Sequence, residues 1–129
     1  MVRVLLADDQ AWLLSSLRLL LEQDSDVEII GEAAEVKSLL ATAEDVCPNL
    51  VLLDWELPGM KTAGVAQQLL LDLHASCPQL RVIVLSGRPE SSVPALSAGA
   101  DYFVSKADPP ESLLDALRAA KLSGGMQGV

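Results

Sequence analysis

Acidic, hydroxyl and amine side chains follow or end four apolar runs in this 129-residue sequence. The first run leads into Asp8 and Asp9, and the second ends at Asp54. The third run ends at the hydroxyl of Ser86, and the fourth leads into the amine of Lys106. Short apolar runs bounded by turn residues are typical of buried strands in a parallel sheet, and the carboxyl ends of such strands share one edge. Ligands bind at that edge in open α/β sheets. We therefore expect these side chains to form one site.

The residue types indicate phosphoryl chemistry. Crowded carboxylates repel one another, and a divalent cation that prefers oxygen ligands, such as Mg²⁺, relieves the repulsion. A carboxylate such as that of Asp54 can attack phosphorus and form an aspartyl phosphate. The cation and Lys106 would neutralise the charge on the transferring group, and the Ser86 hydroxyl can donate a hydrogen bond to a phosphoryl oxygen. The alternative is a structural cluster of ion pairs without chemistry.

Strands and helices are expected to alternate along the chain. Apolar residues recur at helical spacing between the strand-like runs, first at Leu13, Leu17, Leu20 and Leu21 and then at Val36, Leu39, Leu40 and Ala43. This alternation predicts an α/β fold with a doubly wound parallel sheet and right-handed crossovers. The expected strands cover 2–7, 27–31, 50–54, 81–85 and 101–105.

The third helix is expected to begin at Thr62 or a neighbour. Its apolar face is predicted to contain Val65, Leu69 and Leu73, which recur at helical spacing.

The last two helices have clearer start and stop signals. Pro94 suits only the first turn of a helix, so the fourth helix should begin near Ser92, stay short and end at Gly99. The fifth helix is predicted to have Asp108 as its N-cap and Pro109 at its first position. Leu113, Leu114 and Leu117 supply its apolar face.

Composition limits the function classes. The length suits one domain, which we place at 1–122, with 123–129 as a C-terminal tail or the start of a linker. The net charge of −9 argues against nucleic acid as a partner of this domain. No apolar run is long enough to span a membrane, and the first strand reaches acids too soon for a signal peptide. We expect a soluble protein of the cytoplasm.

Two cysteines and one histidine are interpreted as structural. Cys47 and Cys77 are each followed by proline, a polar residue and leucine, so both are placed in loops that enter strands, away from the Asp54 edge. We expect them to be reduced. His74 has no partner motif and is expected at the surface near a helix C-terminus.

Over nearly its whole length the chain resembles the receiver domain of two-component response regulators. The resemblance rests on Asp8-Asp9, on Asp54 followed by Leu57-Pro58-Gly59, on Ser86-Gly87, and on the segment from Gly99 to Lys106. It implies a flavodoxin-like receiver fold with five parallel strands in the order 2-1-3-4-5.

The resemblance also implies roles for individual residues. It makes Asp54 the phosphoacceptor and a metal ligand, with Mg²⁺ held further by Asp8, Asp9 and the backbone carbonyl of Glu56. Ser86 and Lys106 would contact the phosphoryl group.

The same resemblance implies that Phe103 is the switch aromatic that turns inward when Ser86 moves. It also implies weak self-dephosphorylation, and Glu56 and Arg88, which flank the expected site, are candidates for tuning its rate.

The function implied is a signalling switch rather than an enzyme, apart from weak self-dephosphorylation. Its partner would be a histidine kinase or a phosphotransfer protein, and a homodimer is left open. The segment from Lys106 to Leu114 is similar to receivers of regulators with a helix-turn-helix output domain, which would connect the switch to transcription.

Two alternatives stay open. One is a phosphatase with an aspartyl intermediate, for which Glu56 is the only obvious acid after Asp54. The other is a pseudo-receiver that binds partners without phosphorylation.

Overall fold

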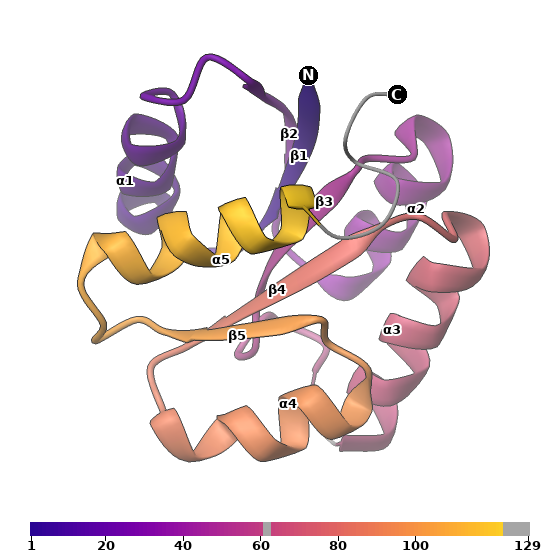
Figure 1. Ribbon diagram of the computed structural model, residues 1–129. Coiled ribbons are helices and arrows are strands. Elements are labelled where there is room, and N and C mark those ends of the chain that lie inside the picture. The colour runs from indigo at the N-terminus through magenta and orange to yellow at the C-terminus, as the bar shows by residue number, and fades with distance from the viewer. Residues whose placement is uncertain (61–62, 123–129) are drawn as a thin grey trace.

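Five parallel strands form one sheet in the order β2-β1-β3-β4-β5 in a computed structural model that describes residues 1–60 and 63–122 (Figure 1). The expected fold class and strand order are therefore confirmed. None of the helices in the described ranges has the length and apolar character to cross a bilayer. The elements are β1 (Val2–Ala7), α1 (Ala11–Leu21), β2 (Val27–Ala33), α2 (Val36–Val46), β3 (Leu50–Asp54), α3 (Ala63–Ser76), β4 (Arg81–Ser86), the 3₁₀ helix η1 (Pro89–Ser91), α4 (Ser92–Ala98), β5 (Tyr102–Ser105) and α5 (Pro110–Leu122).

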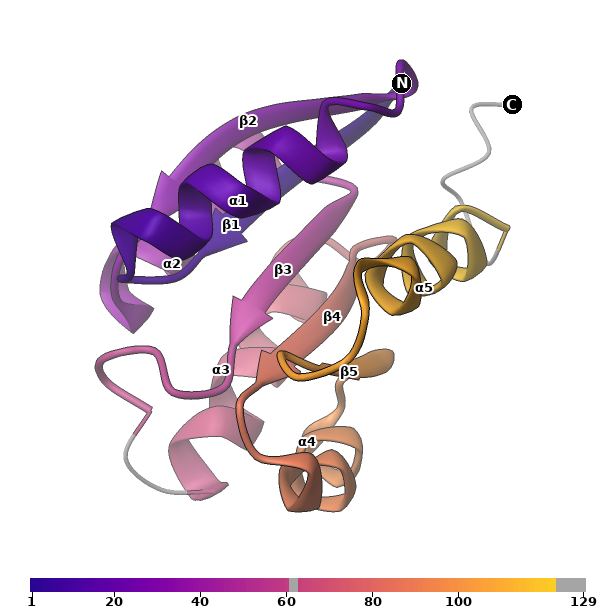
Figure 2. The same cartoon turned by 90° about the vertical axis from the view of Figure 1, so that its left-hand side faces the viewer.

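The two faces of the sheet are buried in separate apolar clusters. Alternate residues of a strand point to opposite faces, so Val51 and Leu53 of β3 join the cluster under α2, α3 and α4, while Leu50 and Leu52 join the cluster under α1 and α5. Figure 2 shows α1 in front of β1 and β2, with its axis running along the strands. Burial on both faces explains why β3 is apolar up to Asp54.

Strand register sets the site. In the two ladders that flank β3, Leu53 pairs with Ala7 of β1, and Asp54 pairs with Leu85 of β4. The residues that follow Ala7 and Leu85 in sequence are Asp8 and Ser86. Register alone therefore brings the first acid pair, Asp54 and the hydroxyl to one edge.

Most predicted limits are confirmed, and a few shift. β2 is an edge strand but continues to Ala33, two residues further than expected. α4 is short and ends before Gly99, whose φ of 118° suits glycine. The turn η1, which the sequence pattern did not indicate, precedes α4.

The N-cap prediction for α5 is wrong. The helix begins at Pro110, one residue later than expected, and the Asp108 carboxylate accepts a hydrogen bond from the backbone N–H of Ser105 at 3.1 Å. The acid therefore ties the end of β5 to the loop before the helix.

The face predicted for α3 is partly wrong. Leu69 and Leu73 are buried, but Val65 is 38% exposed, and Ala66 and Leu70 are buried in its place. A step of four residues drifts around a helix of 3.6 residues per turn, whereas the 66, 69, 70 and 73 pattern stays on one face. Thr62, the expected start, and the tail predicted at 123–129 lie outside the described residues.

The prediction of two reduced cysteines is contradicted, because a disulfide joins Cys47 to Cys77 with Cα atoms 5.8 Å apart. Cys47 directly follows α2 and Cys77 directly follows α3. These helices lead into the adjacent strands β3 and β4, so the two loops meet at the amino-terminal edge of the sheet.

His74 has a partner, which the sequence did not indicate. It is half-buried, and its Nε2 lies 3.3 Å from Oδ2 of Asp101. The same Asp101 oxygen accepts a hydrogen bond from the Val82 N–H at 2.8 Å, so the pair links α3 to the start of β4.

Candidate functional site

Three carboxylates meet at the carboxyl edge of the sheet. One oxygen from each of Asp8, Asp9 and Asp54 lies within 4.8 Å of the others. Asp8 and Asp54 are each only 2% exposed, while Asp9 is open to solvent. The side chains come from the end of β3 and from the residues directly after β1, as the sequence predicted.

Asp8 is held in an electrostatically unfavourable place. Its Oδ1 accepts a hydrogen bond from the Gln10 N–H at 2.9 Å, but its buried Oδ2 has no hydrogen-bond partner among the described residues. Burial raises the pKa of the Asp8 carboxyl, and Asp54 and Asp9 raise it further, against the lowering effects of the Gln10 N–H and Lys106.

This donor set fits a hard divalent cation. Mg²⁺ is bound by carboxylate and carbonyl oxygens, and a buried carboxylate oxygen without a hydrogen-bond donor is a group that such an ion satisfies. The fourth predicted ligand is the backbone carbonyl of Glu56, which belongs to the turn directly after β3. The backbone N–H of Glu56 donates a hydrogen bond to Asp54 Oδ1 at 3.0 Å.

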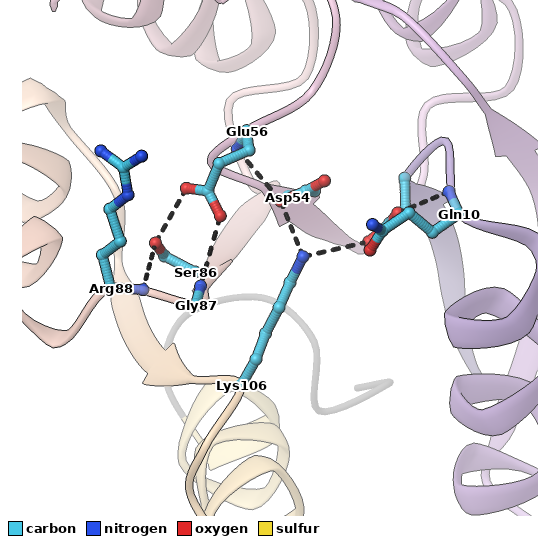
Figure 3. A network of polar contacts seen from close by, with 8 residues as sticks. Gln10, Asp54, Glu56, Ser86, Gly87, Arg88 and Lys106 are labelled. Atoms are coloured by element: carbon cyan, nitrogen blue, oxygen red, sulfur yellow. Dashed lines mark hydrogen bonds and ion pairs between the residues drawn. The ribbon is translucent and has the colours of Figure 1, made fainter.

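Lys106 approaches the acids from the end of β5. Its Nζ lies 3.0 Å from Oδ1 of Asp54 (Figure 3). The same nitrogen lies 3.7 Å from Oδ2 of Asp8. Its backbone N–H donates to the Ser86 carbonyl at 2.8 Å, which anchors the lysine beside β4. The amine is thus directed at the buried carboxylates.

Ser86 bonds with a residue that sequence reasoning placed in another role. Its fully buried hydroxyl donates to Oε2 of Glu56 at 2.8 Å, and the Gly87 N–H donates to Oε1 at 3.2 Å (Figure 3). The Ser86 Oγ also accepts the Arg88 N–H at 3.1 Å. The sequence indicated Glu56 as a backbone ligand, as a tuning residue and as the acid of the phosphatase alternative, but it did not indicate this contact with Ser86.

Phe103 lies in β5, the strand that pairs with β4. Its partner in β4 is Val84, two residues before Ser86, and its partly buried side chain packs against the cluster under α2, α3 and α4. Tyr102 packs against the opposite cluster.

The fold and the site agree with comparisons to known proteins. The family model "Response regulator receiver domain" matches residues 4–118. The chain therefore belongs to the response regulator receiver domain family, which operates in two-component systems. The family is regulatory rather than a classical enzyme family; its members bind Mg²⁺ at an acidic pocket and interact with histidine kinases.

Relatives from several organisms carry the same domain. The chain is 34% identical to the nitrate/nitrite response regulator protein NarL of Escherichia coli, over 91% of this chain and 53% of that protein. It is 31% identical to the transcriptional regulatory protein LiaR of Bacillus subtilis, over 93% of this chain and 56% of that protein. The chain thus spans about half the length of these curated relatives.

A solved structure shows the same architecture. The CheY-like receiver domain protein of Methanospirillum hungatei superimposes with a TM-score of 0.75 at 30% identity, and the match covers 92% of each chain.

Proposed function

We propose that the chain is a phosphorylation-controlled switch that accepts a phosphoryl group on Asp54 from a phosphohistidine of a histidine kinase or phosphotransfer protein. In this step a phosphorus–nitrogen bond of the donor breaks, a phosphorus–oxygen bond to the Asp54 carboxylate forms, and the leaving imidazole takes up a proton. The observation that carries the proposal is the surroundings of the buried Asp54 carboxylate: Lys106 Nζ lies 3.0 Å from it, and one oxygen from each of Asp8 and Asp9 lies within 4.8 Å of one of its oxygens.

Each neighbour of the acceptor has a part in this proposal. Asp8, Asp9, Asp54 and the backbone carbonyl of Glu56 would hold Mg²⁺, which supplies neutralisation of the phosphoryl charge when bound. Lys106 contributes a second positive charge from the end of β5, at the same edge of the sheet.

The signal then passes through β4 and β5. A phosphoryl group on Asp54 draws the Ser86 hydroxyl toward itself and shifts the population of Phe103 conformers, because their strands pair directly. Glu56 and Arg88, whose atoms contact Ser86, tune the lifetime of the phosphorylated state.

We further propose that this switch works in the cytoplasm, where phosphoryl groups derived from ATP are available, and that it controls transcription through an output domain. The name of LiaR as a transcriptional regulatory protein supports this output.

The first experiment uses Trp55, which is partly buried beside Asp54. In a Trp12→Phe background, which removes the other tryptophan, Mg²⁺ is added first and beryllofluoride, a phosphoryl mimic, second. We expect a fluorescence change at each step, and we expect Asp54→Asn to abolish the second. Full phosphorylation of Asp54→Asn, or no response of the parent protein to either addition, would refute the proposal.

A further inference from the structure

The Glu56 side chain already occupies hydrogen-bond donors at the phosphoryl site. One of its carboxylate oxygens accepts the Ser86 hydroxyl at 2.8 Å and the other accepts the Gly87 N–H at 3.2 Å. An anion that takes one hydroxyl and one adjacent N–H with two different oxygens binds as two oxygens of a phosphoryl group would.

We propose that Glu56 is an internal competitor of the phosphoryl group, and that its carboxylate must leave Ser86 and Gly87 before they can bind phosphoryl oxygens. This inference rests on the proposed function. It makes Glu56 a positioning residue, because the phosphoryl group must bind Ser86 and Gly87 strongly enough to displace the Glu56 carboxylate before Ser86 can move.

Burial explains why the exchange is feasible. Ser86 is fully buried, so its hydroxyl needs an acceptor in either state, and passing from one anion to the other keeps it satisfied. Glu56 is exposed, so its side chain can rotate into the solvent after release, and its carboxylate charge is then hydrated rather than buried.

The alternative cause of any effect of Glu56 is its negative charge, which repels an incoming anion at a distance. Glu90 offers a matched control, because it is also an exposed glutamate and lies three residues after Gly87. Glu90→Gln changes the net charge as Glu56→Gln does.

The test measures the beryllofluoride concentration that half-saturates the Trp55 response, with Mg²⁺ saturating for every variant. We expect Glu56→Ala to lower this concentration about tenfold, the scale of one charge-assisted hydrogen bond. Glu56→Gln should give a smaller decrease, since its amide oxygen still accepts one bond, and Glu90→Gln should leave the concentration unchanged.

A double-mutant cycle identifies the contact through which Glu56 acts. If the carboxylate competes for Ser86, the gain from Glu56→Ala shrinks in a Ser86→Ala background. An undiminished gain, or an equal gain from Glu90→Gln, would overturn the inference in favour of general repulsion.

A second measurement needs no phosphoryl mimic. The amide proton of Gly87 should shift upfield in the NMR spectrum of Glu56→Ala without ligands, because it loses a carboxylate acceptor. An unmoved resonance would overturn the inference while leaving Asp54 as acceptor intact. Absence of any beryllofluoride response in the parent protein would instead overturn the proposed function and this inference with it.

Discussion

Lys106 supplies positive charge to both buried acids, and the two contacts have opposite consequences for ligands. Replacing it with alanine removes an ammonium 3.7 Å from Asp8 Oδ2, which competes with a cation for that oxygen. The same change removes a charge that would stabilise phosphoryl oxygens.

We therefore predict that Lys106→Ala binds Mg²⁺ at least as tightly as the parent protein but responds to beryllofluoride about tenfold more weakly or worse. Titration calorimetry measures the first and Trp55 fluorescence the second. Lys37→Ala, a change at an exposed lysine of α2, is the control. An unaltered beryllofluoride response in Lys106→Ala would remove the lysine from the site.

At the scale of residues, the sequence correctly predicted which side chains meet, because their positions depend on where the strands end. Asp54, Ser86 and Lys106 were predicted to meet because parallel strands share an edge, and the structure places all three there. The direction of the Glu56 carboxylate was not predictable, because the rotamer of an exposed side chain in a turn depends on donors that only the fold brings near.

At the scale of elements, an ion pair joins the turn after α1 to the end of α5. Lys121 Nζ lies 2.6 Å from Oδ2 of Asp24. The hydrogen bond from Lys121 lowers the pKa of the Asp24 carboxyl below its usual 3.8, and the Asp26 N–H lowers it further.

This shift predicts a pH dependence of stability. Because the folded pKa is lowered, the ionised carboxylate stabilises the fold above pH 3.8, and this contribution is lost as pH falls through the folded pKa. We expect Asp24→Asn to reduce the free energy of unfolding by about 1 kcal/mol at pH 7, and by less as the pH falls toward and below 3.8.

Urea unfolding of both proteins across this pH range measures the difference. Asp115→Asn breaks an exposed pair with Arg118 within α5 and should change stability little at any pH. A pH-independent loss for Asp24→Asn would assign its role to packing.

Element limits also show how far sequence patterns extend. Pro94 and Gly99 correctly bounded α4, since proline is tolerated only in the first turn of a helix and glycine readily adopts the positive φ found just after its last residue. Val65 was misplaced because a leucine-rich helix offers more than one apolar face, and only packing against the sheet selects between them.

At the scale of the whole molecule, the disulfide closes a loop of 30 residues that contains β3 and α3. Constraining the unfolded chain over such a length stabilises the fold by about 3–4 kcal/mol. We expect reduction to lower the free energy of unfolding by about this amount, with the Trp55 response to Mg²⁺ and beryllofluoride retained, because the bridge and the acids lie at opposite edges of the sheet.

Chemical unfolding with and without a thiol reductant measures the effect. The double variant Cys47→Ser, Cys77→Ser should have the same free energy of unfolding as the reduced protein, and adding the reductant should not change it. Equal stability of the oxidised and reduced proteins would contradict the expected role of the bridge.

The bridge could not be predicted from the sequence. Each cysteine was correctly placed in a loop before a strand, but pairing needs the adjacency of β3 and β4 and the distance between two helix ends. Those depend on how α2 and α3 pack, which no local pattern near Cys47 or Cys77 records.

The central position of β3 has a consequence for the persistence of a signal. All five of its residues are buried and both its neighbours are sheet strands, so its amide hydrogens should exchange with solvent only when the whole domain opens. Asp54 is therefore attached to the segment that opens last, while β2 and β5 can fray at the margins. The lifetime of a phosphoryl group on Asp54 would then be set by the water and the side chains at the site, and not by local unfolding of β3.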